Sequence, residues 1–142
     1  MKLIVRILLL TLISIPLFFF FLLRPTNDLI NWISMEDAEQ MMQKRAKPIM
    51  LHFYTDWCGQ CKRMRTTTFS TPSIASYINA NFYPVRFNAE GSDTITFMGK
   101  TYTNPNPGKK RSKHDFARTM LEGKFLYPTT IFIHNNYKFK LV

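Results

Sequence analysis

The two cysteines of this chain lie three positions apart, in the motif Cys58-Gly59-Gln60-Cys61. Two thiols at this spacing at the start of a helix can close and open a disulfide without a change of fold. The first thiol then lies at the positive end of the helix dipole, which favours the reactive thiolate form. The motif therefore indicates reversible sulfur redox chemistry.

Stabilisation is a weaker interpretation of the pair, because so short a loop constrains little of the unfolded chain. The main chemical alternative is a Cys₂His₂ zinc site that would add two of His52, His114 and His134 to the two thiols. No pair of these histidines has the short spacing usual in such sites. A third hypothesis is a binding, adaptor or metal-handling module that keeps the pair without redox turnover.

The charge of the chain is strongly positive. It has 19 Lys and Arg against 9 Asp and Glu, a formal net charge of +10, and 46% of its 142 residues are hydrophobic. This length and composition suit one packed domain with a short leader. The basic residues are dispersed and no nucleic-acid-binding motif accompanies them, so we expect no nucleic-acid partner. The charge favours a solvated basic surface, or attraction to an anionic membrane or an acidic partner.

The N-terminus is predicted to be a transmembrane signal anchor, residues 1–24. Lys2 and Arg6 precede an almost uninterrupted apolar run, and residues 3–23 are long enough to cross a bilayer. No small-residue cleavage site follows, which favours an anchor over a cleaved signal peptide. The positive residues before the run place the N-terminus inside, so we expect a single-pass protein of the inner (cytoplasmic) membrane with its domain on the periplasmic side.

The elements that must position the cysteines begin after a tether, residues 25–33. Ser34 and Asp37 form a capping-box pattern that starts a helix ending before Lys47-Pro48. Its expected apolar stripe is Met35, Ala38, Met41 and Met42. An apolar strand over residues 49–54 reads as the central strand, and a turn then leads to a helix that opens at Cys58.

A further helix is predicted from Thr71 as N-cap and Pro72 as first residue. Its expected inward side chains are Ile74, Tyr77 and Ile78. A second strand with Val85 and Phe87 follows Pro84.

Residues 89–112 read as an insertion, with a hairpin over residues 94–103 around Gly99. Ser112 and Asp115 form a second capping-box pattern, before a helix whose inner face is Phe116 and Met120. After Pro128 come a strand through residue 133, a turn, and a last strand over residues 137–142. The early strands should be parallel and the last two antiparallel.

Residues 53–62, Phe-Tyr-Thr-Asp-Trp-Cys-Gly-Gln-Cys-Lys, resemble the active-site signature of the thioredoxin superfamily. Pro128, at the start of a distant strand, resembles the cis-proline of that family. The resemblance covers residues 34–142 and implies an α/β thioredoxin-like fold with a central mixed sheet flanked by helices. It extends to exported, membrane-tethered members and to the C-terminal domain of DsbD-type reductases.

The resemblance implies that Cys58 is the exposed nucleophile and that Cys61 is the buried thiol that resolves the mixed disulfide. A cis Pro128 would bring the backbone around Tyr127 beside the sulfurs, where it would meet an extended peptide. The residues expected to bind or support substrate are Trp57, Gly59, Gln60, Tyr127 and Pro128.

Three positions depart from the family pattern. His52 stands where the family carries a buried acid, and as a neutral base it would shuttle the proton of the resolving thiol, titrating nearer neutral pH; the alternative is a polar core residue. Tyr127 is bulkier than the usual residue before the proline and would narrow the substrate groove. The chain ends at Val142, where the family continues into a terminal helix, so we expect apolar surface on one face of the sheet.

The implied activity is that of a thiol–disulfide oxidoreductase that needs no cofactor beyond the cysteine pair. Reduction of protein disulfides is favoured, because Cys58-Gly59 resembles reductases and isomerases more than strong oxidants. The expected partners are disulfide-bearing proteins and a membrane electron donor, since the chain has no further cysteines to relay electrons.

Overall fold

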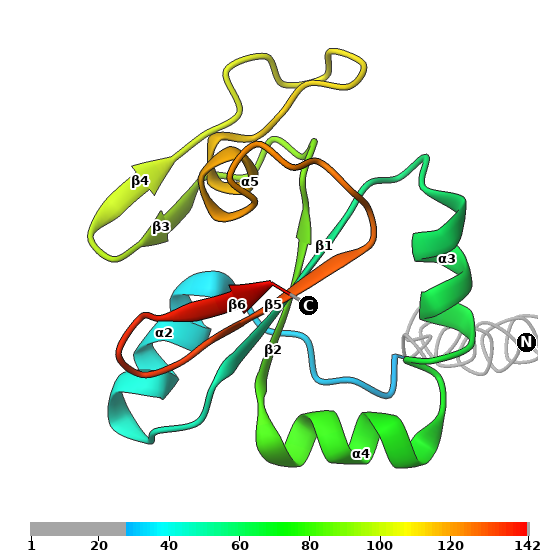
Figure 1. Ribbon diagram of the computed structural model, residues 1–142, viewed down its shortest axis with the longest axis vertical. Helices are drawn as coiled ribbons and strands as arrows, with labels where there is room; N and C mark the ends of the chain where they lie inside the picture. The colour runs from blue at the N-terminus through cyan, green and yellow to red at the C-terminus, as the bar shows by residue number, and fades with distance from the viewer. Residues whose placement is uncertain (1–27, 142) are drawn as a thin grey trace, which may run out of the picture.

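The computed structural model, which describes residues 28–141, shows an α/β fold around a four-stranded sheet in the order β2-β1-β5-β6 (Figure 1). β1 pairs in parallel with β2 and antiparallel with β5, and β5 pairs antiparallel with β6, which confirms the predicted strand directions. The elements in chain order are α2 (Met35–Lys44), β1 (Ile49–Tyr54), α3 (Gly59–Thr66), α4 (Pro72–Asn81), β2 (Tyr83–Asn88), β3 (Ile95–Phe97), β4 (Lys100–Tyr102), α5 (Asp115–Met120), β5 (Thr129–Ile133) and β6 (Phe139–Leu141).

The central strand β1 is covered on both faces, as its unbroken apolar sequence predicts. Its alternate residues Ile49, Leu51 and Phe53 belong to a large core cluster with side chains of α2, α5 and the β3–β4 hairpin. Met50 packs in a second cluster, with side chains of α4 and the turn after α3. Because side chains alternate along a strand, His52 shares the face of Met50 and is directed toward α3.

Helix α2 begins as predicted, since the Ser34 hydroxyl accepts a hydrogen bond from the Asp37 amide at 3.0 Å. The helix ends at Lys44, before the expected end at Pro48. Its buried stripe is narrower than expected, because Met41 is 43% exposed and only Met35, Ala38 and Met42 are buried.

Helix α4 starts at Pro72 with Thr71 as N-cap, as predicted, but the Thr71 hydroxyl donates back to the Thr67 carbonyl and caps nothing. The prediction that Ile74 and Tyr77 face inward is wrong, since they are 37% and 63% exposed. The helix packs against the sheet through Ala75 and Ile78, which lie one turn apart. This contact is narrow, so the Tyr77 side chain stays at the surface of the protein.

The insertion contains the predicted hairpin, formed by β3 and β4 around Met98 and Gly99, which both have positive φ. Carboxylates of α2 hold the hairpin: Glu36 accepts from the Thr96 amide at 2.7 Å, and Glu39 accepts from the Met98 amide. The insertion is therefore anchored to the domain, above the left end of the sheet in Figure 1.

The second predicted capping box is wrong. The N-cap of α5 is His114, whose ring accepts from the Phe116 amide at 3.0 Å. The Ser112 hydroxyl instead accepts from the Asn104 side chain within the preceding loop. The Ser112 hydroxyl is therefore hydrogen-bonded to Asn104 of the loop and does not cap α5.

The described part of the predicted tether, residues 28–33, packs against the domain. Ile30 is 2% exposed, and the Ile33 amide donates to the Pro84 carbonyl at 3.0 Å. The predicted anchor over residues 3–23 lies outside the described residues, and no helix between residues 28 and 141 has the length and apolarity to cross a bilayer.

The last strand is shorter than predicted, because Tyr137 lies in the turn with a φ of 57°. An open groove of about 430 Å³ lies between α3, α4 and β5. It is lined mostly by apolar side chains, among them Met50, Met64 and Phe132, so this face of the sheet carries apolar surface, as expected.

Candidate active site

The cysteine pair lies where β1 gives way to α3. After β1 ends at Tyr54, the chain makes a tight turn in which the Cys58 amide donates to the Thr55 carbonyl at 3.1 Å. Cys58 is the N-cap of α3 and Cys61 lies in its first turn. The two residues form a disulfide, with their Cα atoms 5.3 Å apart.

The helix start favours negative charge on Cys58. The Cys61 amide donates to the Cys58 sulfur at 3.1 Å, and the first turn of α3 has no acidic residue to offset the helix dipole. The amide and the helix dipole stabilise negative charge on a sulfur at this position, so they favour its thiolate form.

The two sulfur residues are equally buried, each 5% exposed. The prediction of an exposed Cys58 beside a buried Cys61 is therefore wrong for this disulfide-bonded form, in which both residues are buried. The exposed residues of the site are the neighbours Trp57, at 56%, Gly59 and Gln60.

One side of the disulfide is bordered by Trp57 and the segment before β5. The Tyr127-Pro128 peptide is cis, as the resemblance predicted. The Tyr127 ring meets the Trp57 ring edge-to-face, with centroids 6.4 Å apart. Three predicted substrate-binding residues, Trp57, Tyr127 and Pro128, are thus brought to one place from segments seventy positions apart in the chain.

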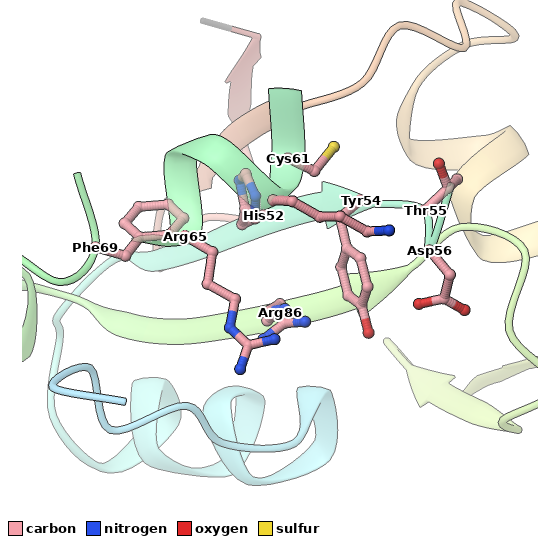
Figure 2. Close-up of a pocket in the computed structure, with 9 residues that line it drawn as sticks. His52, Tyr54, Thr55, Asp56, Cys61, Arg65, Phe69 and Arg86 are labelled. Carbon is pink, nitrogen blue, oxygen red and sulfur yellow. The ribbon is translucent and has the colours of Figure 1, made fainter. Parts of the chain in front are cut away.

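The other side is a small cavity of about 80 Å³ whose lining includes Cys61, His52 and Arg86 (Figure 2). His52 is 2% exposed, and its Nδ1 lies 2.9 Å from the Thr130 hydroxyl. The Phe69 ring packs edge-on against the imidazole with centroids 4.9 Å apart. The structure thus places His52 and Cys61 in the lining of one small cavity.

Burial, and secondarily the positive charge of Arg86, lowers the pKa of His52 from its usual 6.5 to about 4. Both causes disfavour the imidazolium, which would be charged in an apolar setting next to a cation. The expectation that His52 titrates near neutral pH is therefore wrong for this state, and the ring is neutral at pH 7.

Tyr127 has the opposite shift. Burial, and then the nearby Glu90 carboxylate, raises the pKa of its phenol to about 12. Its hydroxyl is buried and finds no hydrogen-bond partner among the described residues. The group therefore stays protonated and contributes to the site through its ring.

Two residues of the site were missed from the sequence. The Trp57 indole donates to one carboxylate oxygen of Glu90 at 2.9 Å, and Lys113 donates to the other at 2.9 Å. Glu90 follows β2, which runs parallel to β1, so the carboxyl ends of both strands meet at one edge of the sheet. That topology could have indicated Glu90, whereas nothing in the pattern around Lys113 points to this site.

The histidines of the alternative zinc site are not assembled around the cysteines. His114 uses both ring nitrogens within the fold, accepting from the Phe116 amide and lying 2.7 Å from the Asp93 carbonyl. In the part of the chain that the structure describes, no three His, Cys, Asp or Glu side chains cluster in a way that could hold a metal ion.

Comparison with known families matches residues 35–138 to the Thioredoxin-like domain family. The match covers most of the chain, from α2 to the turn before β6, and the chain belongs to this family. Among solved structures, similar folds are a DsbH oxidoreductase (TM-score 0.57, 21% identity, 84% of this chain and 79% of that one) and a Thermus thermophilus thioredoxin (TM-score 0.53, 18% identity, 80% and 72%).

Curated relatives include proteins named thiol:disulfide interchange protein DsbD. The Vibrio vulnificus protein is 34% identical over 55 residues, which cover 34% of this chain and 9% of the relative. The Photorhabdus laumondii protein is 43% identical over 49 residues, covering 34% and 8%. This chain thus matches less than a tenth of the length of these relatives.

Proposed function

We propose that this protein is a thiol–disulfide oxidoreductase that reduces disulfides of other proteins through Cys58 and Cys61. The observation that carries the proposal is the disulfide at the start of α3, in which the Cys58 sulfur accepts from the Cys61 amide. The cis Tyr127-Pro128 segment packs through the Tyr127 ring on Trp57, the neighbour of Cys58. The two states of such a pair differ by two electrons and two protons, so the site needs no further redox group.

In the proposed reaction, the reduced protein attacks first with the Cys58 thiolate. Its sulfur bonds to one sulfur of the substrate disulfide, and the other substrate sulfur leaves as a thiolate. Cys61 then loses its proton and attacks the Cys58 sulfur. This step forms the Cys58–Cys61 disulfide and releases the second substrate thiolate, so the substrate gains the two electrons that the pair loses.

His52 is the proposed acceptor of the Cys61 proton. With Nδ1 donating to the Thr130 hydroxyl, its Nε2 is the nitrogen left to accept. The low pKa of His52 keeps the imidazole neutral at pH 7, which is the form that can accept a proton.

Reduction is the proposed direction, because the Cys58-Gly59 start resembles reductases and isomerases more than strong oxidants. The partial matches to proteins named thiol:disulfide interchange protein support exchange chemistry in general. A reductase must be reduced again after each turnover, and we assign that role to a membrane protein that donates electrons from a dithiol.

The proposed location is the extracytoplasmic side of the inner membrane. The apolar run over residues 3–23, with Lys2 and Arg6 before it, supports a single-pass anchor with the domain exported. The anchor would hold the cysteine pair close to a membrane electron donor.

The test is a comparison of Cys58→Ser and Cys61→Ser in the pre-reduced full chain mixed with a protein disulfide. Cys61→Ser should accumulate a mixed disulfide with the substrate, seen as a covalent adduct that dithiothreitol removes, because attack proceeds and resolution does not. Cys58→Ser should form no such adduct. Disulfide reduction that persists in Cys58→Ser would refute the assignment of the nucleophile.

A further inference from the structure

The side chains beside the disulfide form a closed ring of four contacts. The Trp57 indole donates to Glu90, Glu90 accepts from Lys113, the Lys113 ammonium lies 5.5 Å from the centroid of the Tyr127 ring, and that ring packs on Trp57. Each member contacts its two neighbours in the ring. Displacement of one member therefore disturbs two contacts at once.

The ring joins segments that are distant in the chain. Trp57 directly precedes the cysteine motif, Glu90 follows β2, Lys113 precedes α5, and Tyr127 precedes the cis-proline. Lys113 also lies over the Phe125 ring at 5.2 Å, so it contacts the segment that leads to Pro128 at two points. It is the residue that ties this segment to the end of β2.

The ion pair of the ring is partly shielded from solvent. The Lys113 and Glu90 side chains are 22% and 13% exposed, whereas Trp57 is 56% exposed. Charges that are partly withdrawn from water interact more strongly than exposed pairs. A shielded pair thus holds an indole that would otherwise be free to change rotamer at the surface.

The Glu90 end of the ring is itself fixed by the backbone around it. The Asn104 side chain donates to the Glu90 carbonyl at 3.1 Å, and the Asn88 side-chain oxygen accepts from the Glu90 amide at 3.0 Å. Asn88 also donates to Asp56, the neighbour of Trp57, at 2.8 Å. Only the Lys113 side of the ring depends on a single long side chain.

We propose that Lys113 is a positioning residue that holds Trp57 against Tyr127 and thereby sets how tightly an extended substrate peptide binds beside the disulfide. This inference rests on the proposed function. No contact places Lys113 on either sulfur, so its effect falls on the binding of large substrates and spares the sulfur exchange itself.

The test uses the full chain, pre-reduced, in single-turnover oxidation by excess disulfide. Native, disulfide-bonded insulin serves as the protein disulfide, and the disulfide of mercaptoethanol serves as a small one that cannot span the ring. Lys113→Met removes the charge and keeps an unbranched stem, and Lys113→Arg keeps the charge. Lys109→Met is the matched control, since Lys109 is an exposed lysine four positions before Lys113.

We expect Lys113→Met to raise the half-saturating insulin concentration about fivefold, the size of one contact of roughly 1 kcal/mol. Its saturating rate, and its rate with the small disulfide, should stay within about twofold of the original protein. Lys113→Arg should restore the insulin value, and Lys109→Met should leave it unchanged. Glu90→Gln keeps an acceptor for the indole but loses the ion pair. It should therefore raise the half-saturating insulin concentration, as Lys113→Met does.

An equal loss with both disulfides in Lys113→Met would overturn the inference, because it would indicate general damage to the site. No loss with either disulfide would overturn it as well. If Lys113→Met does not fold, Glu90→Gln decides by the same comparison of substrates. Failure of the original protein to react with either disulfide would instead count against the proposed function.

Discussion

The two sides of the disulfide differ in the charge and the hydration of their titratable groups. On the side of Trp57, the charged groups Glu90 and Lys113 are paired and still partly hydrated. On the side of Cys61, a histidine at 2% exposure faces a cavity next to Arg86 and carries no charge at pH 7. The first arrangement fixes the shape of a surface, and the second changes the protonation of groups beside a sulfur.

The two sides are therefore suited to different proposed roles, substrate binding and proton transfer. A charged pair that is still partly hydrated costs less to form than a fully buried one, so the Trp57 side is suited to holding a substrate. In the interior, the cost of charging an isolated group is large, so the His52 side holds a neutral imidazole, the form that can accept a proton. We call these the substrate side (Trp57, Glu90, Lys113, Tyr127) and the proton side (His52, Arg86, Thr130, Cys61).

The largest effect that would separate the two sides is expected at His52. His52→Asn keeps an amide in the place of Nδ1 to pair with Thr130 but cannot take a proton, whereas His52→Leu loses both properties. Both variants should slow release of the second substrate thiol from a preformed mixed disulfide by a factor on the order of 100, the lower range for general base catalysis. Stopped-flow detection of that thiol at pH 7 measures the rate.

His52→Leu should also lose stability, since it leaves the Thr130 hydroxyl without its partner. His52→Asn serves as the control that preserves this contact. A rate that falls in His52→Leu and is unchanged in His52→Asn would show that His52 is a polar core residue and no more.

The next largest effect is a pH dependence of stability. The pKa of His52 is about 4 in the folded chain against a usual 6.5, so the unfolded chain binds more protons between these values. Stability due to this group is complete above pH 6.5 and is lost as the pH falls toward 4, by about 2 kcal/mol at pH 5. The difference between the original protein and His52→Asn in urea-unfolding free energy, taken at pH 7 and pH 5, measures this contribution.

A smaller effect is expected on the substrate side, at Tyr127. Tyr127→Phe removes a buried hydroxyl that has no partner among the described residues and keeps the ring against Trp57. The free energy of unfolding should stay the same or rise by up to about 1 kcal/mol. Thermal unfolding compares the two proteins, and a loss of more than 1 kcal/mol would reveal a partner for this hydroxyl that the account lacks.

The smallest effect is expected at Gly59, between the two sides. A Cβ added there would have open space around it, and its φ lies outside the left-handed region. Gly59→Ala should therefore alter the free energy of unfolding by less than about 0.5 kcal/mol. Circular dichroism during urea unfolding checks this, and a larger loss would mean that the turn before α3 requires glycine.

The cysteine pair and β1 were predictable from the sequence, because each depends on a local signal. The cis Tyr127-Pro128 bond was predicted through the family resemblance alone. The Ile49–Tyr54 strand is buried on both faces and therefore reads as an unbroken apolar run. The cysteine spacing and the position of Pro128 matched a family signature. The start of α2 followed from its cap, since the Ser34 bond to the Asp37 amide joins residues three apart.

The failures share a different cause, which is competition from distant residues. Ser112 had the right spacing to cap a helix, but Asn104 took its hydroxyl. Tyr77 had the right spacing to face inward, but the helix met the sheet through Ala75 and Ile78. The pKa of His52 depends on how deeply β1 is buried and on Arg86 of the neighbouring strand. Neither can be predicted from the residues around His52.

Glu90 and Lys113 were missed for the same reason. Their pairing spans twenty-three positions and depends on the path of the insertion between them. The family signature identified the cysteine motif and Pro128. Glu90 and Lys113, which contact Trp57 and Tyr127 in this chain, are not part of that signature.

The most direct test of the account is the reduction potential of the Cys58–Cys61 pair in the full chain, measured by equilibration with mixtures of reduced and oxidised glutathione. A protein-disulfide reductase should show one reversible two-electron couple near the value of thioredoxin, about −270 mV. A couple near −120 mV would mean that the protein oxidises its partners, which contradicts the proposed direction. Absence of any reversible couple would contradict the proposed redox function itself.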